Sequence, residues 1–487
     1  MSLALKDPGL LRTRAFIDGQ WIDADSGETL AVLNPASGET IAEVARCGQA
    51  ETRRAIAAAE RAQKDWARRT AKERAVLLRK LFDLMMANQE DLARILTAEQ
   101  GKPLAEARGE IAYSANFVDW FAEEARRVYG DTIPAHAADK RIVVIKQPIG
   151  VVACITPWNF PSAMLGRKIA PALAAGCAVV CKPANNTPLS AFAIAVLAER
   201  AGFPPGVINI LGGRTREIGD ELCSNPAVRK LTFTGSTPVG KELMAKCAAT
   251  VKRTSMELGG NAPFIVFDDA DLDAAVAGAI ASKYRNAGQT CVCANRMLVQ
   301  DGIYEAFTAK LATAVAQFRL GDGAQDGINM GPLIDEGAAN EVMSFVEDAV
   351  AKGATVVTGG TRGSLGGSFV EPTILTNVST DMRVFNEEIF GPVAPVFRFS
   401  TEAEAIALAN DTPFGLASYF YARDIGRIWR VAEGLEYGIV GINEGIISTE
   451  VAPFGGVKES GSGREGSKYG MDDYLEIKYL CMGGIDR

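Results

Sequence analysis

Two short segments of the chain carry residues that could act together on a carbonyl compound. RNAGQTCVCANR places Cys291 just after a glycine-containing turn, at the end of a helix predicted over 271–285. A thiol in that position can be a nucleophile if its pKa is lowered locally. RTSMELGGNAP places Glu257 before a glycine pair at a predicted strand end. This carboxylate could serve as the general base that a cysteine nucleophile usually needs.

A carboxylate, a lysine or water must act as the base because the chain contains a single histidine. His136 lies in the polar connector DTIPAHAADK, which we interpret as an exposed loop, so a Ser-His-Asp hydrolase is disfavoured. One imidazole cannot build a His-rich metal site. The pair Cys291 and Cys293 has no second cysteine pair to complete four ligands. We therefore expect no metal.

A third group follows a buried strand. TPWNFP comes directly after the apolar run VVACI, and its Asn159 can present a side-chain amide to a developing oxyanion. Nucleophile, base and oxyanion donor would then all lie at the ends of strands or in the turns beside them.

The elements that must position these groups alternate between strand and helix. The runs VVACI, AVVCK, GVINIL and KLTFT precede helices predicted near 162–175, 188–201, 215–223 and 238–248. This alternation predicts βαβ units, a parallel sheet and a phosphate-bearing ligand at the carboxyl ends of its strands. A second series begins at PFIVF, with the helix over 271–285 and strands near ATVV and APVFRF. The expected fold class is α/β with two α/β domains.

Two segments lie outside both series. Residues 49–97 have the spacing of two amphipathic helices. Near the C-terminus, YLEIKYLCM alternates with period two, as RIVVIKQ does far upstream. Two such strands could pair as an arm that extends a neighbouring subunit's sheet, so we expect a homo-oligomer, either a dimer or a tetramer.

Composition excludes several classes of protein. The 487 residues suggest two or three domains. The net charge is −8 with no basic block, which disfavours binding to nucleic acid or to an anionic membrane surface. The longest strongly apolar stretch, Ile169 to Cys181, is too short to span a bilayer. No secretory signal is apparent at the N-terminus, and most of the nine cysteines sit singly in apolar runs, so we expect reduced thiols in the cytoplasm.

Two matches to nucleotide-binding motifs need testing. GSGREG, Gly461 to Gly466, fits G-x-G-x-x-G but follows no strand and precedes too little chain for a βαβ unit, so we interpret it as a loop. Gly235 to Lys241 fits G-x-x-x-x-G-K and does follow a strand. Glu242 stands where a P-loop needs serine or threonine, which makes a P-loop-like nucleotide-binding protein the weaker alternative. A helix N-terminus at this junction still suits a pyrophosphate.

Taken together, the chain resembles the aldehyde dehydrogenase superfamily. The segments that carry the resemblance occur in the family order, between residues 155 and 466: ITPWNFP, CKPANNTPLSA, FTGSTPVG, MELGGNAPFIVF, RNAGQTCVCANR, EEIFGPV and PFGGVKESGSGREG. The resemblance implies a Rossmann-like cofactor domain over 1–125 and 148–256 and a second α/β catalytic domain over 257–445. It also implies a small β oligomerisation arm with the C-terminal segment, over 126–147 and 446–487.

The resemblance also implies the mechanism. Cys291 attacks an aldehyde, Asn159 holds the oxyanion, hydride passes to a nicotinamide, and Glu257 is the base for hydrolysis of the thioester. The residues implied in cofactor binding are Thr156, Trp158, Lys182, Asn185, Gly235, Ser236, Leu258, Glu388 and Phe390.

Cofactor choice depends on the segment CKPANNTP. Many NAD-preferring relatives carry a glutamate three residues after the lysine, where it binds the adenosine ribose and would repel a 2′-phosphate. This chain has Asn185 there, and Lys182 supplies a cation. We therefore expect NADP to be accepted and preferred to NAD.

Two arginines suggest the substrate. Arg167 and Arg285 fall where the superfamily lines its substrate tunnel, and together they suit a distal carboxylate. These arginines, the CVC sequence and ISTEVAPFGG resemble the succinate-semialdehyde dehydrogenase branch, where a serine at the position of Ser448 helps to bind the carboxylate, with Thr449 the weaker match. We expect succinate semialdehyde as substrate and glutarate semialdehyde, one methylene longer, as the alternative.

Cys293 admits one further hypothesis, which relatives with the same cysteine pair suggest. A disulfide between Cys291 and Cys293 could switch the activity off under oxidising conditions. The alternative is that Cys293 only packs in the interior.

Overall fold

The computed structural model describes residues 3–485. Its larger sheet has eight strands in the order β19-β11-β10-β7-β8-β9-β1-β2. The five central strands are parallel, and the edge strands β19, β1 and β2 run antiparallel to their neighbours. The strands are β1 (Ala15–Ile17), β2 (Gln20–Ile22), β7 (Val151–Ile155), β8 (Ala178–Lys182), β9 (Ile208–Ile210), β10 (Val228–Thr234), β11 (Arg253–Glu257) and β19 (Gly461–Ser462).

Helices cover both faces of this sheet, as the apolar central strands require. On β7, Val152 and Cys154 face a core shared with the helices of one side, whereas Val151 and Ala153 face a core shared with the helices of the other. The first side holds α2 (Ala71–Ala87), α3 (Gln89–Gln100), α4 (Leu104–Glu124), α5 (Pro161–Ala175) and α6 (Leu189–Ala201). The second holds α1 (Gln49–Arg68), α7 (Thr215–Ser224) and α8 (Thr237–Ala248).

The predicted βαβ helices are confirmed, and their ends have local causes. Helix α5 begins with Pro161 in its first turn and ends at Gly176, which adopts a left-handed conformation. The prediction for 49–97 was wrong in number, because three helices occupy this region. Asn88 caps the end of α2 and begins α3, and its side chain donates to the Leu84 carbonyl at 2.8 Å. The long helix α4 was not predicted.

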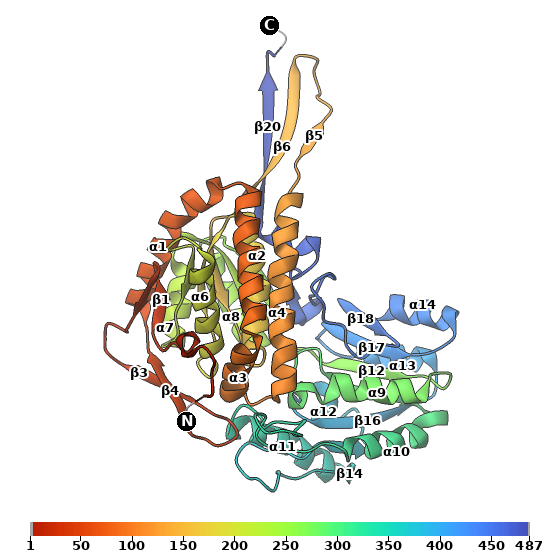
Figure 1. Ribbon diagram of the computed structural model, residues 1–487. Coiled ribbons are helices and arrows are strands. Elements are labelled where there is room, and N and C mark those ends of the chain that lie inside the picture. Colours follow the sequence, from red (N-terminus) through yellow and green to blue (C-terminus); the bar gives the residue numbers. More distant parts are fainter. Residues whose placement is uncertain (1–2, 486–487) are drawn as a thin grey trace.

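The second sheet has seven strands in the order β14-β15-β16-β13-β12-β17-β18, and all neighbours except β14 and β15 are parallel. Its strands are β12 (Ala262–Val266), β13 (Ala294–Gln300), β14 (Thr355–Thr358), β15 (Thr373–Thr376), β16 (Val393–Phe399), β17 (Ala417–Tyr421) and β18 (Ile439–Ile442). Its helices are α9 (Leu272–Lys283), α10 (Tyr304–Val315), α11 (Glu336–Ala351), α12 (Arg383–Asn386), α13 (Glu402–Asn410) and α14 (Ile425–Gly434). Figure 1 shows α4 running along the boundary between the two α/β bodies.

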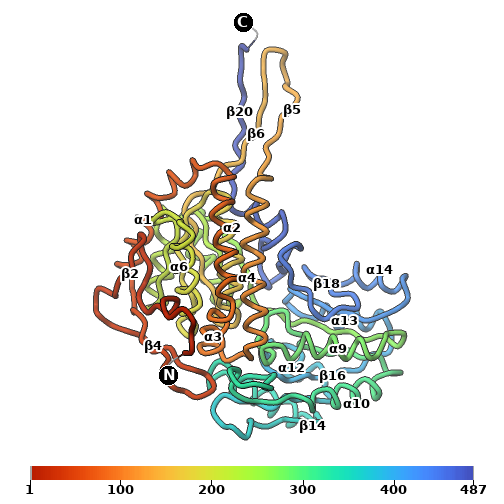
Figure 2. Tube along the Cα trace, viewed as in Figure 1, coloured from red at the N-terminus to blue at the C-terminus, as the bar shows by residue number. Residues whose placement is uncertain are grey.

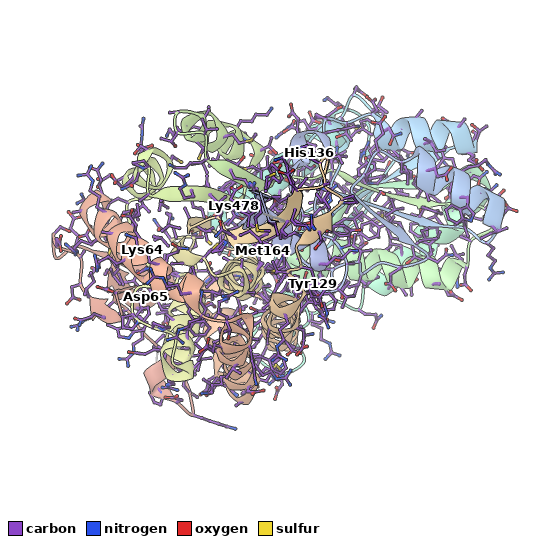
Figure 3. The ribbon with its side chains drawn as sticks, turned by 90° about the horizontal axis from the view of Figure 1, so that it is seen from above. Lys64, Asp65, Tyr129, His136, Met164 and Lys478 are labelled. Atoms are coloured by element: carbon purple, nitrogen blue, oxygen red, sulfur yellow. The ribbon has the colours of Figure 1, made fainter. Side chains whose placement is uncertain are left out.

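An arm of three strands projects from the larger body (Figure 1). It consists of β5 (Asp131–Ile133), β6 (Lys140–Pro148) and β20 (Leu475–Gly483). The expected pairing of the two period-two segments is confirmed, because β20 runs antiparallel to β6 from Leu475 opposite Pro148 to Gly483 opposite Lys140. Figure 2 shows β20 running toward the tip of this arm, far from β2 and β4. Seen from above, His136 lies on the exposed loop of the arm (Figure 3).

Smaller elements complete the chain. A hairpin is formed by β3 (Thr29–Leu33) and β4 (Thr40–Ala45). Short 3-10 helices occur at η1 (Pro8–Leu10), η2 (Ala125–Arg127), η3 (Arg285–Gly288), η4 (Asp301–Ile303), η5 (Lys458–Ser460) and η6 (Lys468–Tyr474). Within residues 3–485, no helix has both the length and the apolar character needed to cross a bilayer.

Candidate active site

Two cavities meet at Cys291. One, of about 260 Å³, is lined by Arg167, Arg285, Ser448 and aromatic side chains, and we call it the arginine cavity. The other, of about 250 Å³, lies at the carboxyl ends of the strands of the larger sheet, and we call it the strand-end cavity. Cys291 and Met164 line both cavities. The thiol can therefore meet a group arriving from either side.

The turn before Cys291 has an unusual backbone. Helix α9 gives way to η3, in which Asn286 and Ala287 have φ of 52° and 53°, and Gly288 follows with φ of 77°. Non-glycine residues in this region cost of the order of 1–3 kcal/mol each and persist only where their surroundings hold them. The turn displaces the chain from the helix axis and brings Cys291 to the wall between the cavities.

The Cys291 thiol is not a ready thiolate. Burial raises its pKa to about 12, and the charges of Glu388 and Glu257 act in the same direction. Arg167 and Arg285 oppose the rise. At neutral pH the thiol therefore needs a proton acceptor or a further favourable charge before it can attack.

Glu257 has the properties of a general base. It ends β11, is 3% exposed, and its Oε2 has no hydrogen-bond partner among the described residues. Burial raises its pKa well above the usual range, and the nearby charge of Glu465 adds to the rise, whereas Arg167 and Lys168 oppose it. A buried carboxylate with an unoccupied oxygen and a raised pKa suits a general base.

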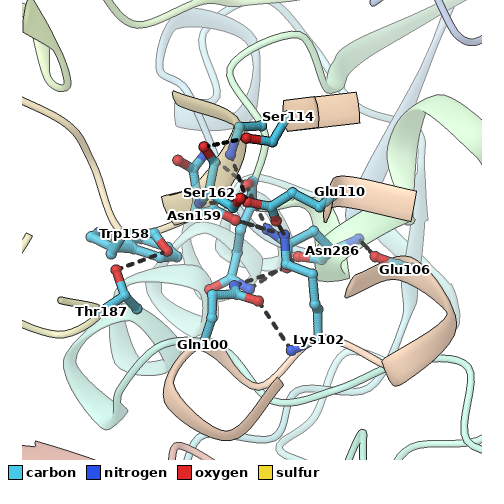
Figure 4. A network of polar contacts seen from close by, with 12 residues as sticks. Gln100, Lys102, Glu106, Glu110, Ser114, Trp158, Asn159, Ser162, Thr187 and Asn286 are labelled. Atoms are coloured by element: carbon cyan, nitrogen blue, oxygen red, sulfur yellow. Dashed lines mark hydrogen bonds and ion pairs between the residues drawn. The ribbon is translucent and has the colours of Figure 1, made fainter. Parts of the chain in front are cut away.

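Asn159 is held in place through its backbone and its side chain (Figure 4). Its Nδ2 donates to the Gln289 carbonyl at 3.0 Å. Its own carbonyl accepts from Lys102 Nζ at 2.8 Å and from Asn286 Nδ2 at 3.0 Å. The side chain lines the strand-end cavity. One N–H of the amide is thereby fixed and the other remains for a developing oxyanion.

A buried ion pair supports this arrangement. Lys102 Nζ and Glu110 Oε2 are 2.6 Å apart, with both side chains 1% exposed. Glu110 Oε1 accepts from the backbone N–H groups of Ser162 and Ala163 at 3.0 and 3.2 Å, at the start of α5. The pair thus joins α4 to the loop that carries Asn159. Sequence reasoning missed both residues, because charges in GKPLAEARGE look like those of any surface helix.

Arg167 and Lys168 share one carboxylate. Arg167 Nη2 lies 2.8 Å from Glu465 Oε2, and Lys168 Nζ lies 2.6 Å from Glu465 Oε1. All three residues are buried. The Arg167 guanidinium also lies 3.9 Å from the centroid of the Phe454 ring. The Arg167 guanidinium is therefore held by partners inside the protein.

Arg285 differs from Arg167. It is half-buried, and its guanidinium lies 5.5 Å from the centroid of the Phe160 ring. It makes no ion pair within the part of the chain that the structure describes. Ser448 lines the same cavity, whereas the Thr449 hydroxyl donates to Glu450 at 3.4 Å. Ser448, and not Thr449, is thus among the residues that line this cavity.

The strand-end cavity gathers most of the residues expected to bind a cofactor, namely Trp158, Gly235, Ser236, Leu258, Glu388 and Phe390. The other three, Thr156, Lys182 and Asn185, lie outside its lining. The Trp158 and Phe390 rings meet edge to face with centroids 5.6 Å apart.

These residues fit a dinucleotide on structural grounds. The buried hydroxyls of Thr156 and Thr234 have no hydrogen-bond partner within residues 3–485. Ser236 is the N-cap of α8 but makes no capping bond, so free backbone N–H groups of this helix face the junction. A helix N-terminus of this kind is suited to a phosphate group.

Glu388 sits beside the glycine pair that follows Glu257. Its Oε1 accepts from the Gly260 N–H at 3.1 Å, and burial raises its pKa to about 8. A Cβ on Gly260 would lie 2.5 Å from the Cys291 carbonyl, and one on Gly259 would lie 2.8 Å from Glu388 Oε2. The glycine pair therefore lets the nucleophile's backbone and the Glu388 carboxylate approach the strand end.

Lys182 and Asn185 follow β8. Lys182 is buried, its Nζ donates to the Pro183 carbonyl at 3.1 Å, and burial lowers its pKa to about 8. Asn185 Nδ2 donates to the Gly213 carbonyl at 2.8 Å, and its Oδ1 accepts from the Gly213 N–H at 3.3 Å. Asn185 thus braces the loop after β9 and brings no negative charge to this region.

Cys293 is not among the residues that line the arginine cavity. It is 7% exposed, and its Sγ donates to the Lys283 carbonyl at 3.3 Å. It is unpaired, as is Cys291. Burial raises the pKa of the Cys293 thiol, and Lys283 opposes the rise.

The two nucleotide-motif matches have other roles. Lys241 Nζ forms an ion pair with Glu459 at 2.8 Å, so it does not reach toward a phosphate at the strand end. The segment Gly461 to Gly466 begins with β19, which pairs with the end of β11, and it carries Glu465. Sequence reasoning treated it as a loop and missed Glu465.

The chain is similar to known proteins over nearly its whole length. A sequence profile described as "Aldehyde dehydrogenase family" matches residues 21–480. The chain is 65% identical to a glutarate-semialdehyde dehydrogenase of Pseudomonas aeruginosa over 483 residues, 99% of this chain and 100% of the relative. It is 64% identical to a 3-sulfolactaldehyde dehydrogenase of Pseudomonas putida, with 100% of both chains covered.

Two further similarities concern succinate-semialdehyde dehydrogenases. The enzyme named succinate-semialdehyde dehydrogenase [NADP(+)] GabD of Escherichia coli is 62% identical over 99% of this chain and 100% of its own length. The crystal structure of succinate-semialdehyde dehydrogenase from Burkholderia pseudomallei superposes with a TM-score of 0.98 at 62% identity, covering 99% of this chain and 100% of that one.

Proposed function

The chain belongs to the aldehyde dehydrogenase family, and from this premise we propose that it oxidises succinate semialdehyde to succinate with NADP or NAD. The observation that carries the choice of substrate is Arg285. It is a cation without an ion pair within residues 3–485, in a cavity that also holds the nucleophile. A short aldehyde with a distal carboxylate can place its reactive carbon at Cys291 and its charge at Arg285.

The residues of the site divide the chemistry among them. Cys291 Sγ attacks the aldehyde carbon and gives up its proton to solvent water, forming a thiohemiacetal whose oxygen is an oxyanion. The free N–H of the Asn159 side chain donates to the resulting oxyanion. Bound NAD(P) would supply the hydride acceptor, and loss of hydride from the former aldehyde carbon would leave the acyl group on Cys291 as a thioester. Glu257 then removes a proton from water, which attacks the thioester, and Cys291 returns as a thiol with release of the acid.

Glutarate semialdehyde is the second candidate. One methylene is worth only about 1–3 kcal/mol in an apolar pocket, and a relative named for this substrate is 65% identical to the chain. The 64% identical relative is named for 3-sulfolactaldehyde, in which a sulfonate replaces the carboxylate. All three names describe a short aldehyde with a distal anion, which supports the role given to Arg285.

NADP is proposed as the preferred cofactor. Asn185 brings no carboxylate to the loop beside Lys182, so the residue at this position does not repel a 2′-phosphate. Lys182 supplies a cation, although burial lowers its pKa. The relative from Escherichia coli is named as an NADP(+) enzyme.

Assembly and location are further parts of the proposal. Strand β20 exposes Ile477, Tyr479, Leu480 and Met482, which is more apolar surface than an isolated arm would keep in water. A homo-oligomer, either a dimer or a tetramer, would cover it. The nine unpaired cysteines support a reducing compartment, so we place the protein in the cytoplasm.

Steady-state kinetics test the proposal. Succinate semialdehyde, glutarate semialdehyde and an uncharged aldehyde of similar length are compared with each cofactor, by absorbance of the reduced nicotinamide. The lowest KM is expected for succinate semialdehyde with NADP, and Cys291→Ala should abolish turnover. Arg285→Ala should raise KM for succinate semialdehyde far more than for the uncharged aldehyde. Equal effects on both aldehydes would reject the anion-binding role.

A further inference from the structure

Some of the charged side chains that line the arginine cavity form ion pairs, and others do not. Among the ionisable side chains that line it, Arg167 is paired with Glu465 at 2.8 Å and Glu110 with Lys102 at 2.6 Å. Two charged groups are left over. Arg285 and Glu106 both line the cavity, and neither forms an ion pair with any residue from 3 to 485. A carboxyl group therefore stands in a cavity that is to receive an anion.

Glu106 and Arg285 are tied to the same point of the chain. Glu106 lies in the first turn of α4, and its Oε2 accepts from the Asn286 N–H at 2.8 Å (Figure 4). Asn286 directly follows Arg285, in the left-handed turn that precedes Cys291. Glu106 Oε1 makes no hydrogen bond within the described part of the chain. The carboxyl group is thus fixed by one oxygen and can present the other to the cavity.

We propose that Glu106 is a specificity-determining residue, which restricts the arginine cavity to aldehydes whose distal group carries a single negative charge. This inference rests on the proposed function, because it concerns the anion that Arg285 would bind. Arg167 is paired with Glu465, and Glu110 is paired with Lys102. Arg285 therefore contributes the one positive charge that the tail can meet. A tail with two negative charges would leave one uncompensated beside Glu106, and that repulsion is strong in a partly buried site.

The charge state of Glu106 then links substrate binding to pH. Burial raises its pKa, and the negative charge of Glu110 acts in the same direction. Lys102, the Asn286 N–H and Arg285 oppose the rise. The remaining charged group of the cavity wall, Arg167 on α5, is compensated by Glu465. The protonated form of Glu106 accepts a singly charged tail best, so KM for an anionic aldehyde should increase as pH rises through the pKa of Glu106.

A matched pair of substrates tests the proposal. Glycolaldehyde sulfate and glycolaldehyde phosphate have nearly the same shape, but the phosphate monoester is dianionic at pH 8 because its second pKa is about 6. The ratio of kcat/KM for the phosphate to that for the sulfate is measured for the wild-type protein and for Glu106→Gln. Glutamine keeps an oxygen that can accept from the Asn286 N–H, so the turn retains its anchor. Glu123→Gln removes the same charge from an exposed position on the same helix and serves as the control.

The ratio should rise about tenfold in Glu106→Gln, because one repulsive charge close to the tail is removed, and it should stay at the wild-type value in Glu123→Gln. The increase of KM for succinate semialdehyde with pH should also flatten in Glu106→Gln, measured against an uncharged aldehyde. An unchanged ratio, or an equal rise in Glu123→Gln, would overturn the proposal. If the wild-type protein oxidises no anionic aldehyde, the proposed function fails as well. If the protein oxidises succinate semialdehyde but the ratio of kcat/KM values is unchanged in Glu106→Gln, only the role of Glu106 is rejected and the proposed function stands.

Discussion

Arg167 and Glu465 form an ion pair in the wall of the arginine cavity, with Nη2 and Oε2 2.8 Å apart and neither side chain more than 4% exposed. The same carboxylate binds Lys168 at 2.6 Å. Glu465 therefore binds two buried cations and leaves Arg285 as the arginine of this cavity without an ion pair among residues 3–485. The negative charge of Glu465 also raises the pKa of Glu257.

Replacing Glu465 by Gln should affect both stability and catalysis. Two buried cations would lose their carboxylate, which should cost about 3–5 kcal/mol of unfolding free energy. Removing the negative charge should also lower the pKa of Glu257. Because the base must be ionised, the acidic limb of the kcat profile should then move to lower pH. Denaturant unfolding and kcat from pH 5 to 9 measure the two effects, with the exposed Glu433→Gln as control. If the acidic limb does not move, the charge of Glu465 does not influence the pKa of Glu257.

Replacing Glu257 by Gln should stop the reaction at the thioester. Loss of a general base costs about 10²–10⁴ in rate, but attack by Cys291 on the aldehyde should continue. Rapid mixing should therefore show a burst of reduced nicotinamide, close to one per active site, followed by very slow turnover. If no burst appears, Glu257 is needed to activate the thiol as well, which the high pKa of Cys291 would then explain.

Replacing Lys102 by Met should loosen the oxyanion donor. The substitution leaves Glu110 as an unpaired buried carboxylate and removes the 2.8 Å bond to the Asn159 carbonyl. Breaking a buried pair costs about 3–5 kcal/mol of stability, and kcat should fall more than KM changes, because Asn159 acts on the developing oxyanion. Thermal unfolding and steady-state kinetics measure the two effects. A loss of stability with unchanged kcat would show that Lys102 supports the fold only.

Replacing Asn185 by Glu should move the cofactor preference toward NAD. A carboxylate beside Lys182 would repel a 2′-phosphate, so kcat/KM for NADP should fall at least about tenfold more than that for NAD. The change also removes the side-chain donor to the Gly213 carbonyl. The same two kcat/KM values are measured for Asn185→Asp, which places the same charge on a shorter side chain. Equal losses with both cofactors would mean that only the loop has been disturbed.

Peroxide should inactivate the enzyme reversibly through Cys291 and Cys293. The two thiols would lose two protons and two electrons to peroxide, and dithiothreitol would restore them. Cys293 Sγ must first leave the Lys283 carbonyl, so formation of the disulfide should be slower than first oxidation of Cys291. In Cys293→Ser, inactivation should become irreversible as Cys291 oxidises further. Recovery of this variant by dithiothreitol to the wild-type extent would contradict the disulfide.

Much of the site could be predicted because its groups stand at strand ends and turns. The strands β7 and β8 are short, continuous apolar runs, and the helices after them start and stop at proline and glycine. Asn159 comes shortly after β7, Glu257 is the last residue of β11, and Cys291 follows the turn after α9. Their local sequence therefore carries enough information to find them.

The supporting charges could not be found in the same way. Lys102, Glu110 and Glu106 lie in a polar stretch whose burial is decided by α5 and the nucleophile turn, far away in the sequence. Glu465 lies in a glycine-rich segment whose pairing with β11 is also long-range. Asn88 divides one predicted helix into two because its side chain bonds to the preceding turn. Each of these features depends on tertiary contacts that periodicity does not encode.

The meeting of two cavities at Cys291 has a consequence for inhibitor design. A compound that passes Met164 can contact Arg285 at one end and Trp158 at the other, so it can occupy both cavities at once. Joining an anionic fragment to an aromatic fragment makes the second contact intramolecular. If the linker has a matching length, the joined compound should bind more tightly than either fragment by orders of magnitude. Such a compound would compete with both the aldehyde and the cofactor, which distinguishes it from ligands confined to one side.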